Sequence, residues 1–211
     1  MENIKIIEIK RLLYKINEQK EINIEHLCFE QGKAYGIYGE SGTGKTTFLK
    51  ILVKLVPEYG GSIQVNGKEL SMLDFKSWWD QIIYLEQESV IIPGSIKDNI
   101  VLDRRLESGF VKQAVHFALL DDFMKKRANG DDVISLNSIS SGEKQQICLA
   151  RMFCQSKQVI IMDEATNALS PGNERMVLKN IMDWIKKENK ILVLVSHNEE
   201  VLNKCDEIIS F

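Results

Sequence analysis

Apolar residues along the chain fall into short runs that alternate with segments of helical spacing. Partial period-two alternation predicts strands over residues 4–9 and 22–29. Short apolar runs predict buried strands over residues 34–38, 82–85, 159–162 and 191–195. Helical composition marks residues 46–54 and 173–187. Apolar strands that alternate with helices indicate an α/β fold with a mostly parallel sheet.

Two further regions refine this outline. Residues 62–65 read as a strand that is followed by Asn66-Gly67, a strong signal for a two-residue hairpin turn. From about residue 95 to 155 the spacing is helical, and no strong strand signal occurs. We therefore expect one domain over 1–211, with a core of about 1–90 and 156–211 and an inserted helical lobe of about 91–155.

A glycine-rich segment follows the predicted strand 34–38 and opens the next helix. It fits the pattern G-x-x-x-x-G-K-[ST], whose backbone N–H groups cradle phosphates. The helix start adds its positive end, a lysine reaches the β- and γ-phosphates, and the next hydroxyl ligates Mg²⁺. The alternative is a chance glycine-rich turn. The residues are Gly39, Glu40, Ser41, Gly42, Thr43, Gly44, Lys45, Thr46 and Thr47.

Two acids end the apolar run 159–162. A carboxylate at the carboxyl end of a buried parallel strand lies at the mouth of the sheet, where α/β proteins bind ligands. Asp163 is a candidate Mg²⁺ ligand, and Glu164 is a candidate base that polarises an attacking water. The alternative is a pair of acids at a solvated strand end, but the phosphate loop in the same chain favours the functional interpretation.

Composition narrows the function classes. The formal net charge is −3, from 27 basic and 30 acidic residues, so no domain-wide basic excess suggests nucleic-acid binding. Cys28, Cys148, Cys154 and Cys205 have no two-residue spacing typical of zinc or redox motifs, and we expect buried, reduced thiols in a cytosolic chain. No apolar run approaches the ~20 residues that cross a bilayer, so a membrane role requires another chain.

Five segments in order resemble the nucleotide-binding domain of ATP-binding cassette (ABC) proteins, from about residue 4 to 211. Beside the phosphate loop and the acid pair, the segment 139–143 resembles the family's signature. Gln87 resembles the glutamine that links the two lobes, and His197 resembles the switch histidine. The resemblance implies a P-loop NTPase with a RecA-like core, an N-terminal antiparallel β subdomain and an inserted helical lobe.

The resemblance also implies roles for these residues. Tyr14 would stack on adenine, Gln87 would join Thr46 and Asp163 at Mg²⁺, and His197 would orient Glu164 and water. Lys45 would act on the phosphates during catalysis. The signature residues Ser140, Ser141, Gly142 and Glu143 would contact the γ-phosphate of ATP bound by a second subunit. For Tyr14, Gln87 and His197, the structural alternatives are a core tyrosine, a surface glutamine and a core histidine. For the signature, the alternative is a helix cap.

Two positions depart from the family pattern. Ser141 replaces a glycine of the signature, and Ser170 stands where the family usually has an aspartate. These changes predict slower or asymmetric hydrolysis rather than loss of ATP binding, for example in a heterodimer with a different cassette.

The expected partners follow from the same resemblance. Residues 93–100 resemble a segment of exporter-type cassettes, whereas residues 133–138 match the exporter pattern poorly. The chain is similar to compact, separately encoded cassettes, which lie in the cytoplasm, peripheral on the inner face of the membrane. We expect a head-to-tail dimer, homo- or heteromeric, an integral membrane permease, and no nucleic acid. The alternatives are a domain of a larger exporter, a non-transport ABC ATPase in DNA repair or translation, and a nucleotide sensor with little turnover.

Overall fold

The computed structural model describes residues 3–126 and 139–211. Its contacts divide the chain into two units. Unit 1 comprises residues 1–84, 157–164 and 184–211, and unit 2 comprises residues 85–156 and 165–183. Within the described part of the chain, no helix is both long enough and apolar enough to span a membrane.

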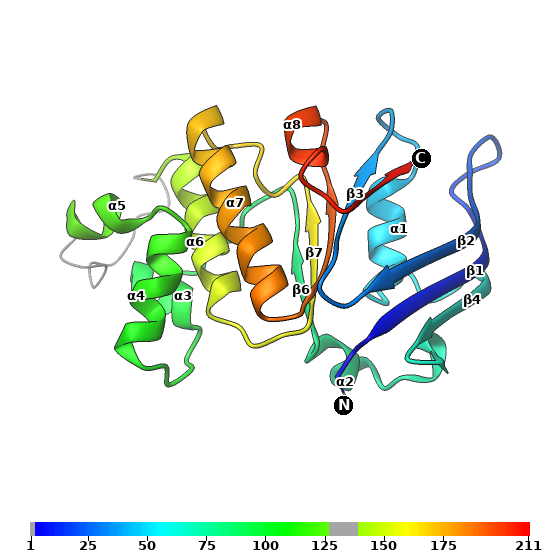
Figure 1. Ribbon diagram of the computed structural model, residues 1–211, viewed down its shortest axis with the longest axis horizontal. Coiled ribbons are helices and arrows are strands. Elements are labelled where there is room, and N and C mark those ends of the chain that lie inside the picture. The colour runs from blue at the N-terminus through cyan, green and yellow to red at the C-terminus, as the bar shows by residue number, and fades with distance from the viewer. Residues whose placement is uncertain (1–2, 127–138) are drawn as a thin grey trace. The chain divides into compact units, whose positions relative to one another are not determined.

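Unit 1 contains two sheets (Figure 1). The antiparallel sheet has the strand order β2-β1-β4-β5. Its strands are β1 (Ile6–Lys15), β2 (Glu21–Glu30), β4 (Gly60–Val65) and β5 (Lys68–Glu69). The second sheet has the order β6-β7-β8-β3-β9, and its β7–β8, β8–β3 and β3–β9 pairs are parallel. Its strands are β3 (Ala34–Tyr38), β6 (Ile82–Leu85), β7 (Val159–Asp163), β8 (Ile191–Val195) and β9 (Glu207–Ser210).

Helices complete the two units. Unit 1 holds α1 (Lys45–Leu52), the 3-10 turn η1 (Leu70–Met72), α2 (Phe75–Trp79) and α8 (Glu199–Leu202). Unit 2 holds α3 (Ile96–Val101), α4 (Ser108–Phe117), α5 (Asp121–Lys126), α6 (Ser141–Phe153) and most of α7 (Pro171–Lys187). The predicted α/β class with an antiparallel N-terminal sheet is confirmed.

Local sequence explains the elements that carry the site. Every residue of β7 and β8 is buried, as the continuous apolar runs predict for strands covered on both faces. The hairpin between β4 and β5 closes at Asn66-Gly67, whose φ angles of 49° and 79° suit a two-residue turn with a left-handed backbone.

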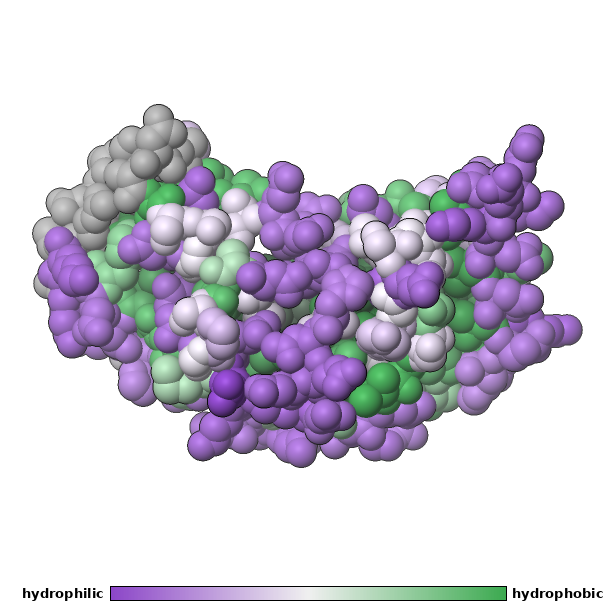
Figure 2. Space-filling view, turned by 90° about the horizontal axis from the view of Figure 1, so that it is seen from above, coloured by the Kyte–Doolittle hydropathy of each residue, from purple (hydrophilic) through white to green (hydrophobic). Residues whose placement is uncertain are grey.

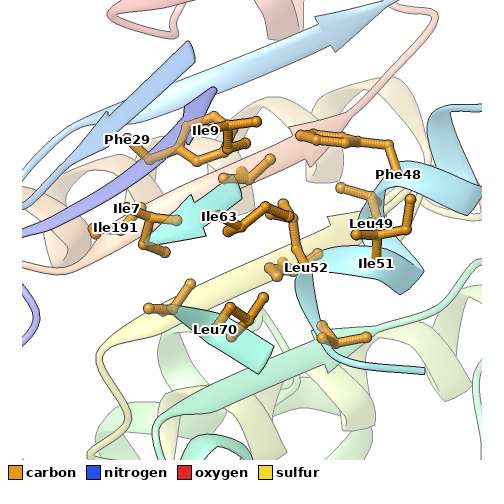
Figure 3. Close-up of a cluster of buried hydrophobic side chains, with 14 of the residues drawn as sticks. Ile7, Ile9, Phe29, Phe48, Leu49, Ile51, Leu52, Ile63, Leu70 and Ile191 are labelled. Carbon is orange, nitrogen blue, oxygen red and sulfur yellow. The ribbon is translucent and has the colours of Figure 1, made fainter. Parts of the chain in front are cut away.

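One hydrophobic core links both sheets of unit 1 to α1. Phe48, Leu49 and Ile51 of α1 are fully buried and contribute to a cluster with side chains from both sheets. Figure 3 shows Ile63 of β4 and Ile191 of β8 in the same cluster as the α1 side chains, with Ile191 next to Ile7 of β1. This packing fixes the start of α1, and therefore the phosphate loop, relative to the sheet. On the face drawn in Figure 2, most side chains are hydrophilic, and hydrophobic ones lie in small groups.

The cysteines correct one expectation. All four are free thiols, but only Cys148 and Cys154 are buried, whereas Cys28 and Cys205 are partly exposed. Cys28 lies on β2, on the opposite face from the buried Leu27 and Phe29. Burial raises the pKa of Cys154 to about 11. The expectation of four buried thiols is therefore wrong for Cys28 and Cys205. At Cys28 the reason is that its apolar neighbours point to the other face of the strand.

Candidate nucleotide-binding site

The phosphate loop joins the end of β3 to the start of α1. Gly42 and Gly44 have φ angles of 79° and 104°, a left-handed backbone that favours glycine. A Cβ at Gly44 would lie 2.7 Å from Cδ1 of Ile16 and 2.9 Å from Cγ1 of Ile22. Gly44 is also the N-cap of α1, so no side chain caps the first helical N–H groups. The loop thus presents unpaired donors at a positive helix end, which suits an anion.

Lys45 folds back along the loop. Its side chain is buried, and its Nζ donates to the carbonyl oxygens of Gly39 and Glu40 at 2.8 Å and 2.7 Å. A lysine held in this way places a positive charge inside the loop without a carboxylate partner among these contacts. This arrangement leaves the charge available for phosphate oxygens, which a lysine binds as a point charge.

Thr46 and Asp163 meet between α1 and β7. Their side chains form a hydrogen bond, and Asp163 is 5% exposed. Burial raises the pKa of Asp163, and the neighbouring charge of Glu164 adds to this effect. The hydrogen bond from Thr46 and the cations Lys50 and Lys45 act in the opposite direction. A hydroxyl and a carboxylate side by side are hard oxygen donors, the ligand type that Mg²⁺ prefers.

Glu164 follows Asp163 and turns away from the strand. Its φ of 51° is unusual for a residue other than glycine, and such strained backbone clusters at active sites. Its N–H donates to the carbonyl of Val195 at 3.2 Å, which ties it to the end of β8. Two residues further along, His197 places Nε2 3.0 Å from Oε1 of Glu164. A histidine bound to a partly exposed carboxylate can hold that carboxylate toward a water molecule.

Unit 1 therefore brings together most of the predicted site. The loop, Thr46, Asp163, Glu164 and His197 all lie at the carboxyl ends of β3, β7 and β8, which are neighbours in one parallel sheet. Tyr14 also belongs to this unit, on β1, where its partly buried ring packs against the hydrophobic core. Its predicted contact with adenine stays a prediction.

Gln87 and the signature lie in unit 2. Gln87 is exposed just after β6. Ser140 is the N-cap of α6 and forms a capping box with Glu143, whose Oε2 accepts from the Ser140 N–H at 2.8 Å and from its hydroxyl at 2.7 Å. The helix-cap interpretation of Ser140 is thus correct for this structure, and a role toward phosphate stays a prediction. Residues 133–138, which match the exporter pattern poorly, lie outside the described residues.

The signature packs against the segment that follows Glu164. A Cβ at Gly142 would lie 3.0 Å from the carbonyl oxygen of Ala168, so the backbones approach closely there. Gln145 accepts from the N–H of Ala168 at 2.9 Å. Ser170, at the end of this segment, accepts from the N–H of Asn173 at 3.5 Å and caps α7. Within unit 2 the two positions that depart from the family pattern, Ser141 and Ser170, therefore flank one contact region.

Sequence reasoning missed two cations beside the site. Lys20, in the turn between β1 and β2, donates to the carbonyl of Gly42 at 3.1 Å. Lys50, in the last turn of α1, acts electrostatically on Asp163. Lys50 could have been found from its helical spacing after Thr46, because residues four apart share a helix face. No short pattern in the sequence signals Lys20, since its contact depends on how the hairpin packs on the loop.

Comparisons with known proteins identify the family. A family model described as ABC transporter matches residues 22–167. A "probable ABC transporter ATP-binding/permease protein" of Haemophilus influenzae is 31% identical over 99% of this chain, which spans 38% of that protein's length. The "probable iron export ATP-binding protein FetA" of Escherichia coli is 26% identical, with 99% of this chain and 92% of that protein aligned.

A solved structure supports the fold. The ATP-bound structure of a bacterial Atm1-family ABC exporter superposes with a TM-score of 0.90 at 21% identity. The match covers 100% of this chain and 38% of the exporter chain. Because the family model spans more than half of the sequence, the chain belongs to the ABC transporter family.

Proposed function

We propose that this chain binds Mg·ATP and hydrolyses it as the nucleotide-binding part of an ABC transporter of the exporter type. The observation that carries the proposal is the convergence in unit 1 of a buried lysine in a phosphate loop, the Thr46–Asp163 pair and the Glu164–His197 pair. Family membership supports ATP binding, and the relatives' names include an export ATP-binding protein and an ATP-binding/permease protein.

Each residue has a defined task in the proposed reaction. Lys45 and the N–H groups at the start of α1 bind the triphosphate, and Tyr14 stacks on adenine. Thr46, Asp163 and Gln87 would hold Mg²⁺, which neutralises charge on the phosphates when bound. Glu164, oriented by His197, accepts a proton as water attacks the γ-phosphate in line. Phosphoryl transfer of this kind depends mainly on positioning and on compensation of charge.

The dimer completes the site in this proposal. Ser140 and Gly142 of the partner subunit reach the γ-phosphate when two chains close head to tail over two ATP molecules. Such closure excludes bulk solvent from the site and is transmitted by the helical unit to a membrane permease. In the described structure the Ser140 hydroxyl is bound by Glu143, so it must reorient to serve a phosphate. This contact favours, as the second candidate function, a nucleotide sensor with little turnover.

Glu164→Gln tests the proposal, because the amide keeps the shape of the side chain but cannot accept the proton. Hydrolysis should fall about 100-fold or more, while ATP binding persists and a nucleotide-dependent dimer accumulates. Glu199→Gln, a change in an exposed acid of α8, is the matched control. Undiminished hydrolysis in Glu164→Gln would refute the assigned base, and co-purification with a multi-helix membrane protein would support the transport role.

A further inference from the structure

A second cluster of ligand-type side chains lies on the antiparallel sheet of unit 1. Glu8 on β1 faces Cys28 on β2 as a direct cross-strand pair, and His26 is two residues before Cys28. Side chains two apart share one face of a strand, so the three groups project from the same face. Their buried neighbours Ile7, Ile9 and Leu27 point to the opposite face, into the hydrophobic core.

The three potential ligand atoms are close together. Glu8 Oε1 lies 3.3 Å from His26 Nε2, and Cys28 Sγ lies 3.9 Å from the same nitrogen. All three atoms lie within 4.8 Å of one another. Tetrahedral zinc, with its usual bond lengths, requires separations of about 3.3 Å between N and O ligands and about 3.6 Å between S and N ligands. The observed distances therefore need only small side-chain rotations.

The charged groups around these three side chains are compatible with a bound cation. Lys10 binds Oε2 of Glu8 at 2.8 Å, which leaves Oε1 directed at His26. Ligating carboxylates commonly hold such an outer hydrogen bond on the second oxygen. The carboxylates of Glu30 and Glu207 also act electrostatically on Cys28. The acids Glu8, Glu30 and Glu207 outnumber the nearby lysines by one, because Lys10 pairs with Glu8 and Lys33 pairs with Glu30. The cluster is partly open to solvent.

From this geometry we infer that Glu8, His26 and Cys28 bind one zinc-like divalent cation, with water as the fourth ligand. The set of one thiolate, one imidazole and one carboxylate favours Zn²⁺ and Co²⁺ over the hard cation Mg²⁺. Binding replaces the S–H bond of Cys28 by a metal–sulfur bond and releases the proton to solvent. The cation would cross-link β1 and β2 at a position separate from the nucleotide site, and the inference does not depend on ATP hydrolysis.

Cobalt titration of the nucleotide-free, reduced protein tests this inference. A thiolate bound to Co²⁺ gives a near-ultraviolet charge-transfer band, which carboxylate and hydroxyl ligands do not give. The band should saturate at one Co²⁺ per chain, disappear when Zn²⁺ is added, and persist in excess Mg²⁺. Zn²⁺ should also raise the melting temperature, because a ligand that binds only the folded state stabilises it.

Variants separate the proposed site from other thiols and histidines. Cys28→Ser should abolish the band and the thermal shift, and His26→Gln should weaken binding at least about tenfold. Both side chains lie on the solvent-facing side of the sheet, so folding should be retained, as far-ultraviolet circular dichroism would verify. His116→Gln, which changes an exposed histidine of unit 2 that is paired with Asp121, is the matched control. Absence of the band in wild type, or its survival in Cys28→Ser, would overturn the inference.

Discussion

The carboxylate of Glu164 lies 3.0 Å from Nε2 of His197, and the exposed fractions of the two side chains are 18% and 47%. If His197 acts by orienting Glu164, its removal should slow hydrolysis without abolishing ATP binding. The two residues then act as a unit, and their substitutions should be strongly non-additive. We expect His197→Ala alone to slow hydrolysis about tenfold or more, and to add little when Glu164 is already glutamine.

A matched histidine provides the control for this cycle. His116 also has a carboxylate partner, Asp121 at 3.0 Å, but belongs to unit 2 and is 72% exposed. His116→Ala should leave single-turnover hydrolysis unchanged. Fully additive losses from His197→Ala and Glu164→Gln would show that His197 works independently of Glu164.

Two glycines should respond to alanine in opposite directions. At Gly44 a methyl group would meet Ile16 and Ile22 at under 3 Å, and φ is 104°, so Gly44→Ala should destabilise the fold by about 1 kcal/mol or more. At Gly109, inside α4, a methyl group would meet no atom within 4 Å. Gly109→Ala should therefore stabilise the fold by about 0.5–1 kcal/mol.

Urea unfolding of both alanine variants measures these changes. Gly44→Ala should also weaken ATP binding, because the methyl group displaces the backbone at the start of α1. Gly109→Ala should leave nucleotide affinity unchanged. Equal stabilities of the two variants would contradict the described geometry of the phosphate loop.

The sequence predicts those elements of the fold that are marked by a pattern of neighbouring residues. The bounds of β3, β6 and β8 agree with the prediction, because each is a short apolar run bounded by polar residues. The prediction ended the first strand too early, at residue 9. In the structure β1 continues to Lys15, but Arg11 has a φ of 48° and the alternation changes phase there. A strand predicted from period-two alternation ends where the alternation is interrupted, so the sequence does not predict the second half of β1.

The elements that sequence analysis missed are short. The α8 helix has 4 residues and β9 has 4 residues, too few to establish a period. The loop and the acid pair were predictable because their chemistry lies in consecutive residues. The Glu8, His26 and Cys28 cluster was not, because it depends on the register between β1 and β2, which no short spacing along the chain reveals.

The buried Asp163 predicts an unusual dependence of stability on pH. Because burial raises its pKa in the folded chain, the unfolded state loses this proton first as pH rises. Protonated Asp163 therefore contributes stability at low pH, and that contribution is lost as pH rises through the folded pKa. Without Mg·ATP, Asp163→Asn should raise the melting temperature at pH 7 by about 2 °C or more.

The pH series provides the check. The difference between Asp163→Asn and wild type should shrink as pH falls toward the ordinary value for aspartate, because wild-type Asp163 then becomes neutral as well. Asp183→Asn, at an exposed position of α7, should show no such trend. A lower melting temperature for Asp163→Asn at pH 7 would contradict the account. In the presence of Mg·ATP the variant should lose its advantage, since it lacks a proposed metal ligand.

The two departures from the family pattern predict a gain of activity. Ser141 is the exposed first residue of α6, and Ser170 caps α7 through its hydroxyl. Ser141→Gly removes a side chain where the backbone would approach phosphate, and Ser170→Asp keeps a capping side chain. ATPase activity of the assembled complex should rise several-fold with the pair of changes. No gain in hydrolysis from either change would refute the proposed cause of slow turnover.

Affinity for Mg·ATP, measured by calorimetry on wild type and Lys45→Met, tests the central claim most directly. Lysine Nζ is the buried cation of the phosphate loop, and a charged hydrogen bond to phosphate contributes about 1.5–3 kcal/mol. Lys45→Met should therefore raise Kd by about 10- to 100-fold, whereas the exposed control Lys76→Met should leave it unchanged. Undetectable binding by folded wild type, or equal Kd values for wild type and Lys45→Met, would contradict the account.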